Sequence, residues 1–304
     1  MSTQFSTAIQ LYSLNNSSDP LPELIRRVSR AGYDGVEFAN RFRETNAKAI
    51  ADALDDTGLE PVACHADLSV IQRAVNGDND LLEKCETVGI SHLVNPHTSM
   101  ASFRSRASVQ SLLAQYGEVA EELAARDMRF VHHTSRHEFW VLMPEMMETM
   151  VGVTPVPEGI TSYVSRELSR LTDSSAGTRT GFQTLVSETS PTNLQFEIDI
   201  AEVTAGRFDP IESISLVENR LPMIHLRDIA PTGRLGTYED AKGGEGAIDF
   251  EQTVDAAVEA GTEWIVYEDE VPQDPKLKLN SGISLMDELN TPSRPHSSPT
   301  GADS

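Results

Sequence analysis

The feature that most constrains the fold is an alternation of short apolar runs with longer amphipathic stretches, which is repeated along most of the 304-residue chain. The short runs have the length of buried strands, and the longer ones have the spacing of helices that pack on a sheet. The predicted strands cover residues 5–12, 35–39, 61–68, 91–97, 129–135, 193–200, 222–229 and 263–269. The clearest predicted helices cover residues 21–31, 45–57, 108–126 and 249–260. Eight strand-and-helix units in about 280 residues predict a (β/α)8 TIM barrel.

A doubly wound parallel sheet is the alternative fold. Such sheets usually carry a glycine-rich phosphate-binding loop after the first strand, whereas the run "GGEG" at 243–246 comes late in this chain and precedes a helix. We therefore expect one barrel domain over residues 1–290, with an insertion at about 140–180 after the fifth strand and a disordered tail over 291–304. The methionines and Trp140 of the insertion would form a lid or a partner surface, or pack on their own barrel.

The chain is strongly acidic, with 47 acidic against 24 basic residues and a formal charge of −23. Such a charge repels phosphates, which argues against nucleic acid and anionic membranes as partners. Acidic excess with few lysines resembles proteins of salt-loving organisms, so a halophilic source is expected, with an ordinary acidic cytosolic protein as the alternative. A charged leader and a membrane-length apolar run are both missing from the sequence, so a cytoplasmic location is expected.

Two acidic residues stand inside one predicted strand, in the stretch "NLQFEIDIAE" at 193–202. Glu197 and Asp199 alternate with apolar residues and therefore share one face of the strand. If the strand is parallel and covered on both sides, two buried carboxylates need positive charge nearby. The sequence therefore predicts a compensating cation at this place.

Polar residues also end the other predicted strands, at the edge where TIM barrels carry their chemistry. By strand parity His133, His225 and Glu268 can point into the barrel mouth together with Asp199. Carboxylates and a histidine on different strands suit Mn²⁺, Mg²⁺ or Co²⁺, with Zn²⁺ as an alternative. Taken singly, His225 is also compatible with a core histidine and Glu268 with a solvated run of acids.

Several strings in the chain resemble the sugar phosphate isomerase/epimerase family, the xylose-isomerase-like TIM barrels. They are "QLYSL", "AGYDGVEFA", "ALDDTGLEPVACHADL", "HHTSRHEF", "LQFEIDIAEVTAGRFDP", "IHLRD", "GEGAIDF" and "WIVYEDEVPQDP". The resemblance implies one divalent metal held by a Glu, an Asp, a His and a second Glu. By motif position these are Glu138, Asp199, His225 and Glu268. The chain departs from the family pattern at Ser135, where a second histidine is usual.

The resemblance and the metal set together predict an isomerase or epimerase of a sugar, sugar phosphate or related polyol, acting through an enediolate. A carboxylate at the metal, Glu138 or Glu268, would move the proton. The expected substrate-binding residues are His65, His97, His133 and Arg227, with Arg227 binding a phosphate or pairing with Asp228 or Asp199. The alternatives are a dehydratase of an inosose-type keto-polyol, an apurinic endonuclease and a non-catalytic barrel. The oligomeric state stays open, with a homo-oligomer as one option.

Overall fold

The computed structural model describes residues 5–142, 180–233 and 237–291. Its centre is a closed barrel of eight parallel strands in the order β1-β10-β7-β6-β5-β4-β3-β2. The barrel strands are β1 (Ser6–Gln10), β2 (Gly35–Phe38), β3 (Glu60–His65), β4 (His92–Asn95), β5 (Arg129–His133), β6 (Gln195–Asp199), β7 (Met223–Leu226) and β10 (Trp264–Tyr267). The predicted TIM barrel is therefore confirmed.

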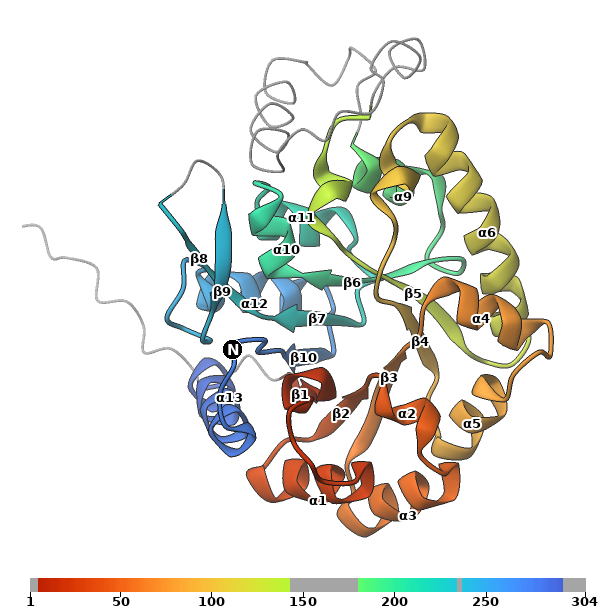
Figure 1. The fold of residues 1–304 in the computed structure, drawn as a ribbon. Coiled ribbons are helices and arrows are strands. Elements are labelled where there is room, and N and C mark those ends of the chain that lie inside the picture. Colours follow the sequence, from red (N-terminus) through yellow and green to blue (C-terminus); the bar gives the residue numbers. More distant parts are fainter. Residues whose placement is uncertain (1–4, 143–179, 234–236, 292–304) are drawn as a thin grey trace, which may run out of the picture.

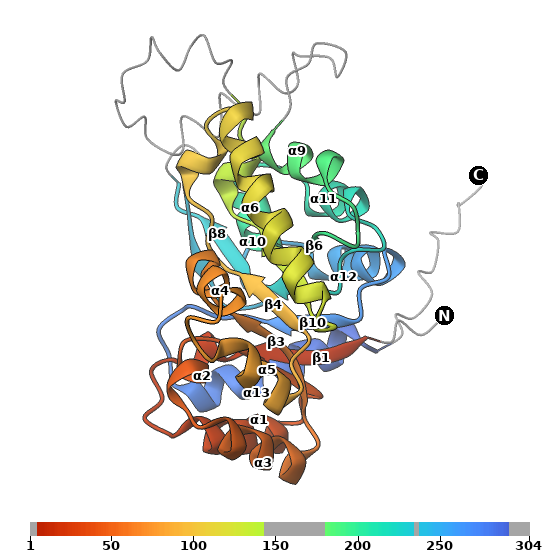
Figure 2. The same cartoon turned by 90° about the vertical axis from the view of Figure 1, so that its right-hand side faces the viewer.

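Helices surround the strands as an outer ring (Figure 1), and the side view shows α6 along the outside of the barrel (Figure 2). They are α1 (Leu21–Ala31), α2 (Arg41–Glu44), α3 (Ala47–Thr57), α4 (Leu68–Val75), α5 (Leu81–Val88), α6 (Arg106–Ala124), α9 (Gly181–Glu188), α10 (Ile200–Ala205), α11 (Pro210–Leu216), α12 (Phe250–Glu259) and α13 (Pro275–Leu289). Short 3₁₀ turns are η1 (Leu11–Leu14), η2 (Met100–Phe103) and η3 (Arg136–Phe139). In the described ranges, we find no helix that is both long and apolar enough to cross a membrane.

Helix α1 shows how the pattern produces the outer layer. Leu21, Leu24, Ile25 and Val28 recur at helical spacing and are all buried against the barrel. The helix ends at Gly32, whose φ of 108° lies in the left-handed region that residues with a Cβ seldom adopt.

The apolar interior has two main parts. The larger cluster lies between the barrel and its helices, and the smaller one fills the inside of the barrel. The buried members of the inner cluster are Ala8, Val62, Ala63, Val94, Val131, Met223 and Val266. Along the strands, Met223 comes before His225 on β7, and Val131 comes before His133 on β5. The inner cluster is thus an apolar floor beneath the polar residues at the carboxyl ends of the strands.

Two elements differ from the sequence-based expectation. The predicted strand 193–200 ends at Asp199, because this side chain accepts hydrogen bonds from the N–H groups of Ala201 and Glu202 and starts α10. The predicted strand 222–229 is divided at Arg227 into β7 and a new strand, β8 (Asp228–Pro231), which pairs antiparallel with β9 (Tyr238–Ala241). Ile229 of β8 packs on α10, so the hairpin lies beside the carboxyl end of β6 (Figure 1).

The expected insertion lies almost wholly outside the described residues, and so does the predicted tail after Thr291. At the insertion's two ends, Val141 and Thr180 form an antiparallel bridge.

Candidate metal centre

Two groups of acidic and histidine side chains meet inside the barrel and share His225. The upper group consists of His133, Asp199, His225 and Glu268, and the lower group consists of Glu37, His65, Glu197 and His225. In each group, one potential ligand atom from every residue lies within 4.8 Å of the others. The upper group comes from four adjacent strands, β5, β6, β7 and β10, and therefore lies on one side of the mouth.

The upper group converges on the Nδ1 atom of His225. This atom is 2.9 Å from Oε2 of Glu268 and 3.4 Å from Nε2 of His133. The same His133 nitrogen is 3.9 Å from Oδ2 of Asp199. His133 and Asp199 are the last residues of their strands, and Glu268 directly follows β10, so all three stand at the carboxyl ends of barrel strands.

Asp199 uses both carboxylate oxygens. Oδ1 caps α10, while Oδ2 is 3.0 Å from the Arg227 guanidinium. Burial raises the pKa of Asp199 to about 6, and the nearby Glu202 and Glu268 carboxylates act in the same direction. Arg227 opposes this shift only in part. Arg227 thus supplies part of the positive charge that the sequence predicts. Because the pKa of Asp199 stays raised, a further cation nearby would stabilise its charged carboxylate.

Two further members of the upper group, His133 and Glu268, have the charge states that metal ligands need. Burial and the neighbouring His225 lower the pKa of His133 to about 3, which leaves its imidazole neutral, the form that binds metals. Although burial acts to raise it, His225 lowers the pKa of Glu268 to about 2, so that carboxylate is charged. The Nδ1 atom of His133 is buried without a hydrogen-bond partner among the described residues. Two imidazoles and two carboxylates therefore suit a divalent cation.

The lower group spans the barrel axis. Glu37 of β2 faces Glu197 of β6 from the opposite side, and His65 of β3 likewise faces His225 of β7. Nε2 of His225 is 2.7 Å from Oε2 of Glu37, and Nε2 of His65 is 3.0 Å from Oε2 of Glu197. Burial lowers the pKa of both histidines, but the carboxylates outweigh it, raising the pKa of His65 to about 10 and that of His225 well above its ordinary value.

Access to the two groups is restricted. Glu37, Glu197, Asp199 and His225 are fully buried. The side chains of His65, His133 and Glu268 retain 12%, 11% and 8% exposure, respectively. Among these seven residues, solvent therefore reaches only the edge that His65, His133 and Glu268 form.

Arg227 is already bound to carboxylates. Besides Asp199, its guanidinium contacts Asp240 of the hairpin at 2.7 Å, with Glu202 at 3.6 Å and Glu270 at 3.8 Å. Of the two pairings that the sequence suggested, the structure has the one with Asp199. Asp228 instead accepts hydrogen bonds from the N–H groups of Gly244 and Gly246 and holds the "GGEG" loop.

Glu138 and His97 lie apart from both groups of ligands. The Glu138 carboxylate is fully buried, 2.8 Å from Nε2 of His132, and also accepts the N–H of Ser135 at the start of η3. His132 faces Tyr116 of α6, as its parity predicts for a residue that packs against the helices. His97 is exposed in the loop after β4. In the structure, His133 rather than Glu138 thus lies within reach of Asp199, His225 and Glu268.

Two residues of the lower group were not assigned a role from the sequence. Glu197 is recognisable as a buried acid because it shares the strand face of Asp199. Glu37 is the third residue of β2, in the run "GVEF", where an acid inside a buried strand is the local signal.

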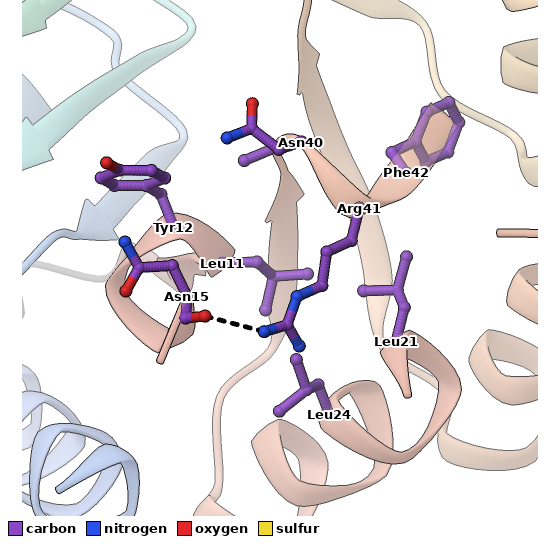
Figure 3. Close-up of a pocket in the computed structure, with 9 residues that line it drawn as sticks. Leu11, Tyr12, Asn15, Leu21, Leu24, Asn40, Arg41 and Phe42 are labelled. Carbon is purple, nitrogen blue, oxygen red and sulfur yellow. Dashed lines mark hydrogen bonds between the residues drawn. The ribbon is translucent and has the colours of Figure 1, made fainter. Parts of the chain in front are cut away.

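A cavity of about 160 Å³ lies beside the mouth, between the loops that follow β1 and β2 (Figure 3). Its wall is largely apolar, with Tyr12 and Asn40 at its polar side, and it contains none of the residues of the two ligand groups. The Arg41 guanidinium in its wall donates to the backbone carbonyls of Asn15, Ser17 and Asp19. This arginine therefore fixes the first loop of the barrel.

Comparison with known proteins supports the fold. No family model and no curated protein matches the chain. Among solved structures, a sugar phosphate isomerase/epimerase from Parabacteroides distasonis is similar, with TM-score 0.68, 17% identity and coverage of 95% of this chain and 96% of the other.

Two further solved structures are similar at lower identity. The probable 3-DHS dehydratase AsbF from Bacillus anthracis has TM-score 0.63 and 12% identity, over 93% of this chain and 98% of its own. An AP endonuclease, family 2, from Brucella melitensis has TM-score 0.59 and 14% identity, over 92% and 99%. The chain thus has the fold of xylose-isomerase-like barrels, and neighbours of this fold differ in activity.

Proposed function

We propose that this protein is a divalent-metal-dependent isomerase or epimerase of a sugar or related polyol. The observation that carries the proposal is the convergence of His133, Asp199, His225 and Glu268 at the carboxyl ends of four adjacent strands. These residues would hold a divalent cation, which would supply Lewis-acid stabilisation of negative charge on the substrate. Mn²⁺, Mg²⁺ and Co²⁺ suit the mixed oxygen and nitrogen donors, with Zn²⁺ as the alternative.

The residues at the accessible edge perform the remaining steps. Glu268 is charged and accepts the proton from the carbon next to the carbonyl, then returns it to the adjacent carbon or to the other face. His65 and His133 line the same edge and bind substrate hydroxyls. The narrow opening keeps water from the proton while it is held on the protein.

An uncharged polyol suits the described part of the mouth better than a phosphorylated one. A phosphate at Arg227 would have to displace the carboxylates of Asp199 and Asp240 and would meet Glu202 and Glu270. Arg136 and Arg41 are engaged as well, by Glu202 and by backbone carbonyls respectively. We therefore place Arg227 as an organiser of the mouth, and the sequence-based role in phosphate binding becomes the less favoured alternative.

A substrate screen tests the proposal. Mn²⁺-loaded protein is incubated with ketoses, aldoses and their phosphates in deuterated water, and the products are identified by NMR. Isomerised or epimerised product with deuterium at the reacting carbon supports the proposal. Loss of water from a keto-polyol would instead identify the dehydratase, which uses the same proton removal. Turnover that is independent of metal would contradict both.

The endonuclease alternative is tested separately. A net charge of −23 disfavours a DNA-binding groove. Cleavage of a duplex that contains an abasic site, at moderate salt and with Mn²⁺ or Zn²⁺, would overturn the proposed carbohydrate function. A protein that binds no divalent cation and converts no substrate would instead support the non-catalytic barrel.

A further inference from the structure

His225 lies between the two groups and presents a different ring nitrogen to each. Nδ1 faces Glu268 and His133, whereas Nε2 faces Glu37 and Glu197. We infer that Glu37, His65 and Glu197 are positioning residues, which hold the His225 imidazole so that Nδ1 is directed at the metal. The inference rests on the proposed metal site of the upper group.

The contacts of the lower group form a closed ring of alternating acids and histidines. Besides its aligned bond to Glu37, Nε2 of His225 is 3.1 Å from Oε1 of Glu197. Nε2 of His65 bonds Glu197 and is also 3.2 Å from Oε1 of Glu37. These two Oε1 atoms lie close to a histidine nitrogen without an aligned hydrogen bond. Each carboxylate is thereby held between two imidazoles, and each imidazole between two carboxylates.

This ring fixes the orientation of the His225 imidazole, with Nε2 toward Glu37 and Glu197 and Nδ1 toward the upper group. An ionised carboxylate only accepts hydrogen bonds, so Nε2 of His225 is the donor in its aligned bond to Glu37. An imidazole that keeps its hydrogen on Nε2 has only Nδ1 to offer to a metal. Carboxylate partners of metal-binding histidines act in this way, by fixing the tautomer and the ring orientation.

The ring has little freedom to rearrange. Glu37, Glu197 and His225 are fully buried, and the rings of His65 and His225 are stacked with centroids 5.5 Å apart and planes 12° apart. Gln10 donates a further hydrogen bond of 2.7 Å to Glu37 from β1. Below the ring lies the apolar floor.

The test measures the affinity for Mn²⁺ alone, by calorimetric titration of metal-free parent, Glu197→Gln and Glu37→Gln proteins. A glutamine keeps the size of the side chain, but its NH₂ group can donate to Nε2, which allows the hydrogen to move to Nδ1. We expect one Mn²⁺ per parent chain and a Kd that is raised about 10- to 100-fold in each variant.

Asp228→Asn is the matched control. Asp228 is also buried, but its carboxylate accepts hydrogen bonds from backbone N–H groups and does not contact a histidine among the described residues. This variant should lower the melting temperature and keep the parent Kd. A merely structural role for the lower group predicts the same behaviour for Glu197→Gln and Glu37→Gln.

The outcomes separate the inference from the proposed function. Variants that melt at a lower temperature but bind Mn²⁺ with the parent Kd would overturn the inference and leave the metal site intact. Two Mn²⁺ per parent chain, with one lost in Glu37→Gln, would also overturn it, because the lower group would then be a ligand set itself. A parent that does not bind Mn²⁺, Mg²⁺, Co²⁺ or Zn²⁺ would refute the proposed function, and with it the inference. If one of the two glutamine variants fails to fold, the Mn²⁺ affinity of the other tests the inference.

Discussion

The imidazole of His225 and the carboxylate of Glu268 meet across neighbouring strands, with 2.9 Å between Nδ1 and Oε2. Glu268 is only 7% exposed and sits in the upper group, so it is not part of a solvated acidic run. The contact defines the side of the barrel at which a metal and a substrate would meet.

Glu268→Gln should therefore abolish most activity. The substitution removes a charged ligand and the proton acceptor, and loss of proton transfer alone costs about 100- to 10,000-fold in rate. Binding of Mn²⁺ should weaken as well, while the circular dichroism spectrum stays that of the parent. Glu270→Gln is the control, because Glu270 is 3.8 Å from Arg227 and lies outside both ligand groups. A Glu268→Gln protein with parent turnover and parent Mn²⁺ affinity would remove this residue from the site.

His133 and Glu138 give opposite expectations for the fourth metal ligand. Because His133 is in the upper group and the Glu138 carboxylate is bound to His132, His133→Gln should weaken Mn²⁺ binding. Glu138→Gln should keep the Mn²⁺ affinity. It should lower the free energy of unfolding by about 1–3 kcal/mol, because the buried His132 loses its carboxylate partner. Calorimetry with Mn²⁺ and urea unfolding measure the two effects. The reverse pattern would show that Glu138 turns to the metal, as the family resemblance implies.

Stability should fall at low pH in part through Glu202. Burial acts to raise the pKa of Glu202, but the Arg136 guanidinium, 2.7 Å away, has the larger, opposite effect. The pKa therefore falls from an ordinary 4.5 to about 2. As the pH falls, Glu202 is protonated in the unfolded chain before it is protonated in the folded chain. The contribution of its ion pair to the free energy of unfolding is therefore complete above about pH 4.5 and is lost as the pH falls toward 2. Unfolding free energies at pH 6 and pH 3 should therefore differ less for Glu202→Gln than for the parent. An equal difference in both proteins would contradict the ion pair.

The melting temperature should rise with salt. With a formal charge of −23, the folded chain repels itself in dilute buffer, and the Debye length falls from about 10 Å at 0.1 M to about 3 Å at 1 M salt. Thermal unfolding from low to molar KCl measures the effect. A melting temperature that stays constant or decreases would refute the prediction of a salt-adapted chain.

The barrel itself was predictable from the sequence because strand and helix periodicities are local. The hairpin β8–β9 was not, because "HLRDI" continues the alternation of β7 without a turn residue. The upper group followed from strand parity at the carboxyl ends. The lower group did not, because Glu37 and Glu197 meet only through closure of the barrel, across opposite strands. For Glu138, the short turn η3 decides the direction of the side chain, which motif position alone does not fix.

The central claim is that the upper group holds a divalent cation, and a crystal soaked with Mn²⁺ and measured for anomalous scattering tests it most directly. We predict one anomalous peak per barrel, in contact with Nδ1 of His225, Nε2 of His133 and the carboxylates of Asp199 and Glu268. Metal-to-ligand distances should be about 2.0–2.3 Å, the range of metal bonds to nitrogen and oxygen donors. A peak among Glu37, His65 and Glu197, or no peak inside a barrel that soaks Mn²⁺ elsewhere, would contradict the account.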